Sequence, residues 1–258
     1  MKYTQFLCFE VGRECNLAGY HQDCPSGTLD RYGSLDVSTA ITDKQVVDSA
    51  VEAYAALGFA GNVAWHYYNE PMLQWDRLQA LMAAIREKVT SARFTLWTNG
   101  TLLHKGTAGL DLLDQIWVTN YRGRDWNWLH ERVPRVVVFA PYLDERRRPL
   151  EKDKLDFCLR PYNELIVDNY GNGHLCCADW RGACVLGNIR DADGFAGVVE
   201  RFQAARNQAS QQPMPDDAPN VCRRCRIRQR HIADLVPAVQ KITEEDKPWI
   251  TKQPILSE

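Results

Sequence analysis

The fold is decided by the segment NVAWHYYNEP, residues 62–71. Its first part, from Asn62 to Tyr67, is apolar and aromatic and has the length of a short buried strand. Pro71 then stands where the first turn of a helix would begin, because proline lacks an N–H group that this turn leaves unpaired in any case. The segment therefore predicts a strand followed at once by a helix, which we expect to continue to about Val89.

The same alternation extends on both sides of this segment. Upstream, we expect an apolar strand over residues 3–11 and a helix over residues 42–57, with Thr42 and Asp43 as candidate caps. Downstream, we expect strands and one short helix over residues 93–97, 102–113 (the helix), 115–119 and 135–139. Strands separated by helices form right-handed βαβ units, so this part of the chain predicts an α/β fold with a parallel sheet.

The pattern changes near Pro141. A charged stretch over residues 144–154 is typical of a linker, and residues 165–177 carry a β-hairpin pattern around the turn sequence NYGNG. A helix is expected over residues 193–208, and a proline-rich loop over residues 211–219. We therefore predict a first domain over 1–145, a smaller second domain over 146–236 and a polar tail over 237–258.

Composition limits the function classes. The 258 residues are 45% hydrophobic, enough for a proper core, and carry a net charge of −2, which argues against a nucleic-acid-binding protein. The sequence holds no run of about 18 apolar residues, so we expect no membrane span. Its first residues also lack the pattern of a signal peptide, so we expect a cytoplasmic protein.

Nine cysteines stand in two groups along the chain. In a reducing cytoplasm they are poor candidates for structural disulfides, and none lies between Cys24 and Cys158. This gap favours two metal sites in two parts of the chain. The cysteines are Cys8, Cys15, Cys24, Cys158, Cys176, Cys177, Cys184, Cys222 and Cys225.

The second group contains a Cys-x-x-Cys knuckle, Cys222 to Cys225, which presents two thiolates from one tight turn. Cys158 and Cys176 would complete a set of four ligands. Four thiolates hold zinc or an iron–sulfur cluster equally well in principle, so the residues alone leave both open. We interpret Cys177 and Cys184 as small buried hydrophobic residues, since Cys177 points to the opposite face of its strand from Cys176.

The spacing of this second group resembles the SPASM/twitch auxiliary-cluster domain of radical S-adenosylmethionine (SAM) enzymes. The matching features are Cys158, Gly171 and Cys176, the hairpin over 165–179, the segment LGNI at 186–189 and the closing Cys222-x-x-Cys225. Within this family, the inosamine dehydrogenases of aminoglycoside biosynthesis are similar in length and in these spacings. The resemblance implies one auxiliary [4Fe–4S] cluster held by Cys158, Cys176, Cys222 and Cys225.

The first group resembles the family's cluster motif only at its ends, Cys15-Asn-Leu and Cys24-Pro. The family motif is Cys-x3-Cys-x2-Cys, whereas eight residues separate Cys15 from Cys24 here. His21 stands where the middle cysteine would be, and imidazole replaces thiolate on iron in some centres. We therefore predict Cys15, His21 and Cys24 as ligands of a second [4Fe–4S] cluster. Cys8 is the alternative third ligand, and loss of this cluster is a further alternative.

Two more segments resemble family features at the ends of predicted strands. Asn69-Glu70-Pro71 resembles the segment that receives the SAM amino group, and Glu70 would also suit a helix start. Thr98-Asn99-Gly100 resembles a common Thr-Asn-Gly segment and would also suit a strand-to-helix turn. The resemblance thus implies Asn69, Glu70 and Asn99 as SAM-binding residues.

Together these features imply a partial (β/α) TIM-like barrel followed by a small twitch domain made of a β-hairpin and a helix. The implied protein is a radical SAM oxidoreductase with SAM and two [4Fe–4S] clusters, in which the cofactor rather than a side chain generates the radical. We expect a small, possibly sugar-like substrate and an electron donor such as flavodoxin or ferredoxin. The alternatives are an enzyme that modifies a ribosomal peptide, a non-catalytic relative and a zinc-binding interaction module.

Overall fold

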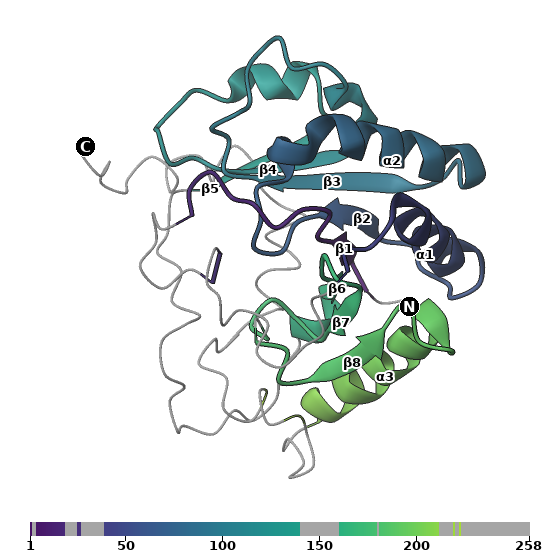
Figure 1. Cartoon of the computed structure of the whole chain (residues 1–258). Coiled ribbons are helices and arrows are strands. Elements are labelled where there is room, and N and C mark those ends of the chain that lie inside the picture. Colours follow the sequence, from purple (N-terminus) through teal and green to yellow (C-terminus); the bar gives the residue numbers. More distant parts are fainter. Residues whose placement is uncertain are drawn as a thin grey trace.

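The computed structural model of the chain describes residues 1, 4–18, 25–26, 39–139, 160–179, 181–211, 219 and 222. Within this part, the strands form one eight-stranded sheet in the order β5-β4-β3-β2-β1-β6-β7-β8 (Figure 1). The strands are β1 Phe6–Phe9, β2 Asn62–Trp65, β3 Arg93–Thr98, β4 Gln115–Thr119, β5 Arg135–Phe139, β6 Glu164–Val167, β7 Asn172–His174 and β8 Val185–Asn188. The α-helices are α1 Asp43–Ala55, α2 Trp75–Lys88 and α3 Gly194–Ala209, and the 3-10 helices are η1 Pro71–Gln74, η2 Leu110–Leu112, η3 Asn127–Glu131 and η4 Arg160–Tyr162.

The first five strands are parallel, as the alternating pattern predicts. α1 and α2 pack on one side of these strands (Figure 1). Leu7 and Phe9 of β1 belong to the same buried apolar cluster as residues of both helices. Cys8 lies between them in sequence and belongs to a second cluster with Ala64 and Ile166. Because side chains alternate along a strand, the sheet has one face covered by α1 and α2 and an opposite face marked by Cys8.

The C-terminal strands extend the same sheet instead of forming a separate one. β6 pairs in parallel with β1, and Cys8 lies opposite Ile166 in this register. β7 and β8 then add antiparallel strands, and α3 packs against β8 and β7. The predicted hairpin and the helix after it are therefore confirmed, and the α/β fold contains a mixed sheet. The domain boundaries at residues 145 and 236 fall outside the described residues and stay predictions.

One expected helix, over residues 102–113, is wrong. This segment forms turns, and only Leu110 to Leu112 are helical, as the 3-10 helix η2. Gly109 has a φ of 74°, which breaks a helix, and the Thr107 hydroxyl accepts a hydrogen bond from the backbone N–H of His104. The predicted cap at Thr42 is confirmed, since its side chain accepts from Gln45 N and the two residues form a capping box.

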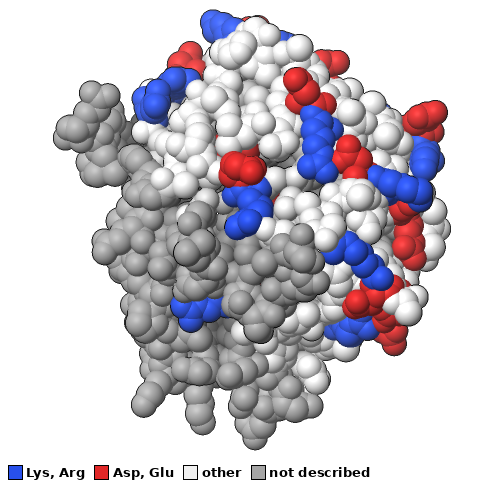
Figure 2. Space-filling model, viewed as in Figure 1, with Lys and Arg blue, Asp and Glu red and all other residues white. Residues whose placement is uncertain are grey.

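Charged side chains of both signs are mixed over the described surface (Figure 2). Several of them form ion pairs, among them Arg77 with Asp43 at 2.6 Å and Arg86 with Asp114 at 3.2 Å. This mixture fits the small net charge of the chain. In the described part of the chain, none of the helices has the length and apolar character needed to cross a membrane.

Candidate functional site

Three predicted site segments meet at the carboxyl edge of the parallel strands. Cys15 lies in the loop after β1, Glu70 lies after β2 and Asn99 lies after β3. The backbone N–H of Glu70 donates to the carbonyl of Glu14 at 2.8 Å. The side chain of Asn99 donates to Asn16 Oδ1, also at 2.8 Å. Both chain neighbours of Cys15 are therefore tied to the segments predicted to bind SAM. In sheets of this kind, ligands bind at this edge.

Glu70 holds two of these segments together. Its carboxylate accepts hydrogen bonds from Thr98 Oγ1 at 2.6 Å, from Asn99 N at 2.8 Å and from Met72 N at 2.9 Å. Burial raises the pKa of this carboxyl group, and the three hydrogen bonds oppose the rise. The bond to Met72 N confirms that Glu70 also starts a helical turn. A bound ammonium group would therefore meet an acid already fixed in place by its neighbours.

The turn after β3 is equally well defined. Asn99 Oδ1 accepts from the backbone N–H and the hydroxyl of Thr101 at 2.9 Å and 2.6 Å. Gly100 has a φ of 72°, a conformation that favours glycine. Asn69 Oδ1 accepts from Tyr67 N at 3.1 Å and shapes the turn before Glu70. Asn69, Glu70 and Asn99 thus occupy adjacent, ordered turns, and their roles toward SAM stay predictions.

The predicted cluster ligands are only partly within the described residues. Cys15 is half-buried, whereas Cys176 and Cys222 are 7% and 6% exposed. Cys176 lies two residues after the end of β7, and its carbonyl accepts from Asp179 N at 3.1 Å. The remaining predicted ligands lie outside the described residues; they are His21, Cys24, Cys158 and Cys225. Two of the three described thiols are therefore buried and one is half-buried, and their roles as cluster ligands stay predictions.

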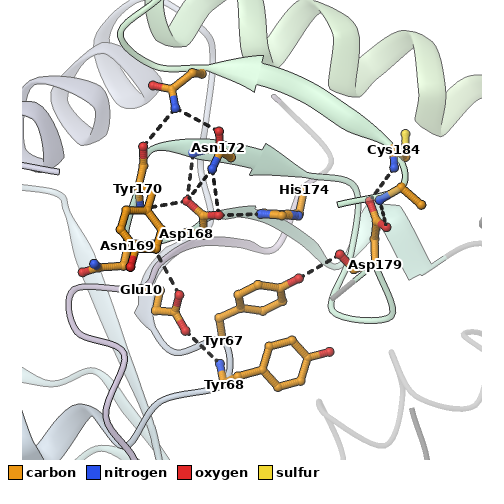
Figure 3. Close-up of polar contacts among 12 residues, drawn as sticks. Glu10, Tyr67, Tyr68, Asp168, Asn169, Tyr170, Asn172, His174, Asp179 and Cys184 are labelled. Atoms are coloured by element: carbon orange, nitrogen blue, oxygen red, sulfur yellow. Dashed lines mark hydrogen bonds and ion pairs between the residues drawn. The ribbon is translucent and has the colours of Figure 1, made fainter. Parts of the chain in front are cut away.

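Two adjacent tyrosines connect the segment before Glu70 to the loop after Cys176, and Figure 3 shows the bond from Tyr67 to Asp179. The Tyr68 hydroxyl donates to the carbonyl of Cys177, and the Tyr67 hydroxyl donates to the carbonyl of Asp179 at 3.0 Å. Tyr68 N also donates to the buried carboxylate of Glu10 at 3.3 Å. The segment from Tyr67 to Glu70 therefore contacts both the loop after β1 and the loop after Cys176. This role was not predicted, although both tyrosines belong to the segment 62–71.

A buried ion pair supports the hairpin that carries Cys176. His174 Nε2 and Asp168 Oδ2 are 3.0 Å apart, and the two residues are at most 1% exposed (Figure 3). Burial alone would raise the pKa of Asp168, but the hydrogen bond and charge of His174 outweigh it and lower the value. Asp168 also accepts from Asn172 N at 2.9 Å, which closes the turn. The pair was not predicted, because nothing in the hairpin pattern marks it.

The other three cysteines are placed as follows. Cys177 is 5% exposed and lies in the same cluster as Cys8, which confirms its interpretation as a buried residue. Cys184 is half-buried, and burial raises the pKa of its thiol to about 12. Cys8 is fully buried within β1, opposite Ala64 and Ile166. Cys8 therefore lies in the body of the sheet and not in the cysteine loop.

Comparisons with known proteins agree with the cysteine spacing. Residues 158–226 match the model of the SPASM family, described as an iron–sulfur cluster-binding domain. The chain is 29% identical over 207 residues to the S-adenosyl-L-methionine-dependent 2-deoxy-scyllo-inosamine dehydrogenase of Niallia circulans, covering 73% of this chain and 79% of that protein.

Two solved structures share the fold. The crystal structure of BtrN in complex with AdoMet and 2-DOIA matches with a TM-score of 0.60 and 21% identity, over 81% of this chain and 88% of that one. The open conformation of BtrN matches with a TM-score of 0.55 and 22% identity, over 84% of this chain and 91% of that one. The fold of this chain is therefore similar to that of a protein solved in complex with AdoMet.

Proposed function

We propose that the chain is a radical SAM oxidoreductase that oxidises a small, sugar-like substrate. The predicted resemblance to radical SAM enzymes with a SPASM-type iron–sulfur domain, which supports this proposal, is confirmed. SAM and a [4Fe–4S] cluster would supply a 5′-deoxyadenosyl radical that removes hydrogen from a substrate carbon, and an auxiliary [4Fe–4S] cluster would receive the remaining electron. The dehydrogenase named among the relatives supports oxidation as the reaction class.

The observation that carries this proposal is the joining of the Cys15 loop to the turns that contain Glu70 and Asn99. Cys15, His21 and Cys24 would hold the first cluster and leave one iron open. Glu70, Asn69 and Asn99 would then orient SAM beside it. Glu70 is well suited to bind the SAM amino group, because the residue is 2% exposed. A charge-assisted hydrogen bond is strong where water is largely excluded.

The auxiliary cluster would be held by Cys158, Cys176, Cys222 and Cys225. Four protein thiolates leave no open iron, so this cluster would carry an electron and not bind the substrate. The hydrogen bonds from Tyr67 and Tyr68 to the loop after Cys176 support such a role, since they fix the loop relative to the SAM side.

Three aromatic rings supply a surface against which a small substrate could pack. Trp97 lies 4.7 Å from Trp117 and 5.6 Å from Phe139, measured between ring centroids. Trp97 also contacts His66, which follows β2. Aromatic faces of this kind offer a large apolar contact area.

We propose that the enzyme works in the cytoplasm and receives its electrons from a flavodoxin or ferredoxin.

Anaerobic reconstitution with iron and sulfide tests the proposal. About eight irons per chain would correspond to two four-iron clusters, and incubation with SAM and a reductant should release 5′-deoxyadenosine. The variant His21→Ala should lose one cluster and keep the other. Full retention of both clusters would refute the ligand role of His21, and a colourless protein without iron would contradict the proposed function.

A further inference from the structure

Three metal-ligating side chains converge on the sheet face that carries Cys8. The sulfur of Cys8, a ring nitrogen of His66 and a carboxylate oxygen of Glu164 all lie within 4.8 Å of one another. The distance between His66 Nε2 and Glu164 Oε2 is 3.9 Å. The three residues come from β1, from the end of β2 and from the start of β6. None of them is among the seven ligands predicted for the two clusters, although Cys8 is the alternative third ligand of the first cluster.

The sheet topology explains why these residues meet. β1 is the central strand of the three, with β2 on one side and β6 on the other. In this register Cys8 lies opposite Ala64 and Ile166, while Glu164 lies opposite Phe6. Neighbouring strands are about 4.8 Å apart, so side chains of adjacent strands on one face come within ligand distance. Residues separated by more than 150 positions thus form one cluster.

The surroundings favour a cation. Cys8 is fully buried, Glu164 is 6% exposed and the His66 side chain is 13% exposed. A bound cation would lower the cost of burying the Glu164 carboxylate at this place. The backbone N–H of Cys177 donates to Glu164 Oε1 at 3.0 Å, which leaves the other oxygen directed toward His66. A supporting hydrogen bond of this kind is common behind metal-ligating carboxylates.

The Cys8 thiol has a second thiol as a neighbour. Burial raises the pKa of Cys8 well above its ordinary value, and the nearby Glu164 and Cys177 raise it further. The thiol is therefore protonated in the metal-free protein. A divalent cation reverses this preference, because a coordinating thiol is deprotonated. The Cys177 thiol thus lies near Cys8 on this face of the sheet.

We propose that Cys8, His66 and Glu164 bind a divalent metal ion of the zinc type. A mixed set of sulfur, nitrogen and oxygen donors suits zinc. In a tetrahedral zinc site the ligand atoms lie roughly 3–4 Å apart, so the three side chains need to close in by about 1 Å at most. The proposal does not depend on the radical chemistry, although His66 also contacts Trp97 of the aromatic surface proposed for the substrate.

Zinc analysis of the iron-loaded protein tests the site. The full-length chain is reconstituted with iron and sulfide, incubated with zinc sulfate and freed of loose metal by gel filtration. We expect one zinc per chain beside the full iron content. X-ray absorption at the zinc edge should show mixed sulfur and nitrogen or oxygen ligands. The variants Cys8→Ser, His66→Gln and Glu164→Gln should each weaken zinc binding at least tenfold and keep their iron.

The matched control is Cys184→Ser, which removes a half-buried thiol outside the site and should retain zinc. Wild-type protein without bound zinc, or equal zinc content in wild type and all three variants, would overturn the proposal. An all-sulfur zinc spectrum would also overturn it, since the metal would then occupy cluster cysteines. If a variant fails to fold, the wild-type spectrum alone decides. Zinc bound here in a protein that takes up no iron would support this site and contradict the proposed function.

Discussion

Asn99 donates a side-chain hydrogen bond of 2.8 Å to Asn16, a residue 83 positions earlier in the chain. Asn16 in turn donates to the Thr101 hydroxyl at 2.6 Å. Asn16 directly follows Cys15, so these two bonds fix one side of the cysteine loop to the turn after β3. The bond from Glu70 N to the carbonyl of Glu14 fixes the other side. The place of the Cys15 thiol is thus set by two turns that follow neighbouring strands.

Removing the Asn16 side chain should weaken SAM binding. The variant Asn16→Ala loses both side-chain bonds, which together contribute about 2 kcal/mol, so we expect roughly thirtyfold weaker binding with an unchanged iron content. Calorimetric titration of the reconstituted protein with SAM measures the effect. The control is Asn127→Ala, an exposed asparagine in η3, which should bind SAM like the wild type. Equal affinity of the two variants would contradict this account of the loop.

Replacing Gly100 should destabilise the turn that carries Asn99. A Cβ atom at Gly100 would lie 2.8 Å from both Trp126 Cζ2 and Val118 Cγ1, in addition to the strain of a φ of +72°. We expect Gly100→Ala to lower the free energy of unfolding by about 2–4 kcal/mol, from strain and overpacking together. Gly58 has a similar φ of +65° with nothing within 4 Å of such an atom. Gly58→Ala should therefore show only the strain, and urea unfolding that finds equal losses would count against the clash.

The Tyr68 hydroxyl should matter for the auxiliary cluster. Tyr68→Phe removes the hydrogen bond to the carbonyl of Cys177, which directly follows the predicted ligand Cys176. We expect a change in the midpoint potential of the auxiliary cluster, while the first cluster keeps its potential. Redox titration followed by electron paramagnetic resonance separates the two. The control is Tyr54→Phe, whose hydroxyl donates to Gly61 O. If both variants leave the auxiliary potential at the wild-type value, Tyr68 has no influence on the cluster.

Cys184 should resist alkylation at neutral pH. Burial and, to a smaller extent, the carboxylate of Asp179 together raise the pKa of its thiol to about 12. Because the pKa is raised, the reactive thiolate is scarce below that value, at roughly one molecule in ten thousand near pH 8. Its reaction with iodoacetamide should therefore be slow in the folded protein and speed up as the pH rises. Mass spectrometry of the digested protein, with the unfolded chain as control, checks this; rapid labelling of folded Cys184 near pH 8 would refute it.

Much of the fold was accessible from local patterns. The strands Gln115–Thr119 and Arg135–Phe139 have the predicted bounds, because each is a continuous apolar run between turn residues. β8 was missed, since it is short and contains Gly187. The parallel pairing of β6 with β1 was also missed, because it joins residues far apart in sequence and leaves no local signal.

The site was predictable where a resemblance fixed residues to the ends of strands. Cys15, Glu70 and Asn99 were placed in this way, and the structure brings their segments together. Glu10 was not predicted, because it accepts hydrogen bonds from the backbone N–H groups of Tyr68 and Asn169, which lie far away in sequence. Only the paired strands show that these backbone groups meet its carboxylate.

The central claim is that SAM binds to an iron at the Cys15 loop. Electron paramagnetic resonance of the reduced, reconstituted protein with and without SAM tests it most directly. We predict that SAM changes the signal of one of two clusters, and that Cys15→Ala lacks this cluster while keeping the other. A spectrum that SAM leaves unchanged, or a Cys15→Ala variant with both clusters still present, would contradict the claim.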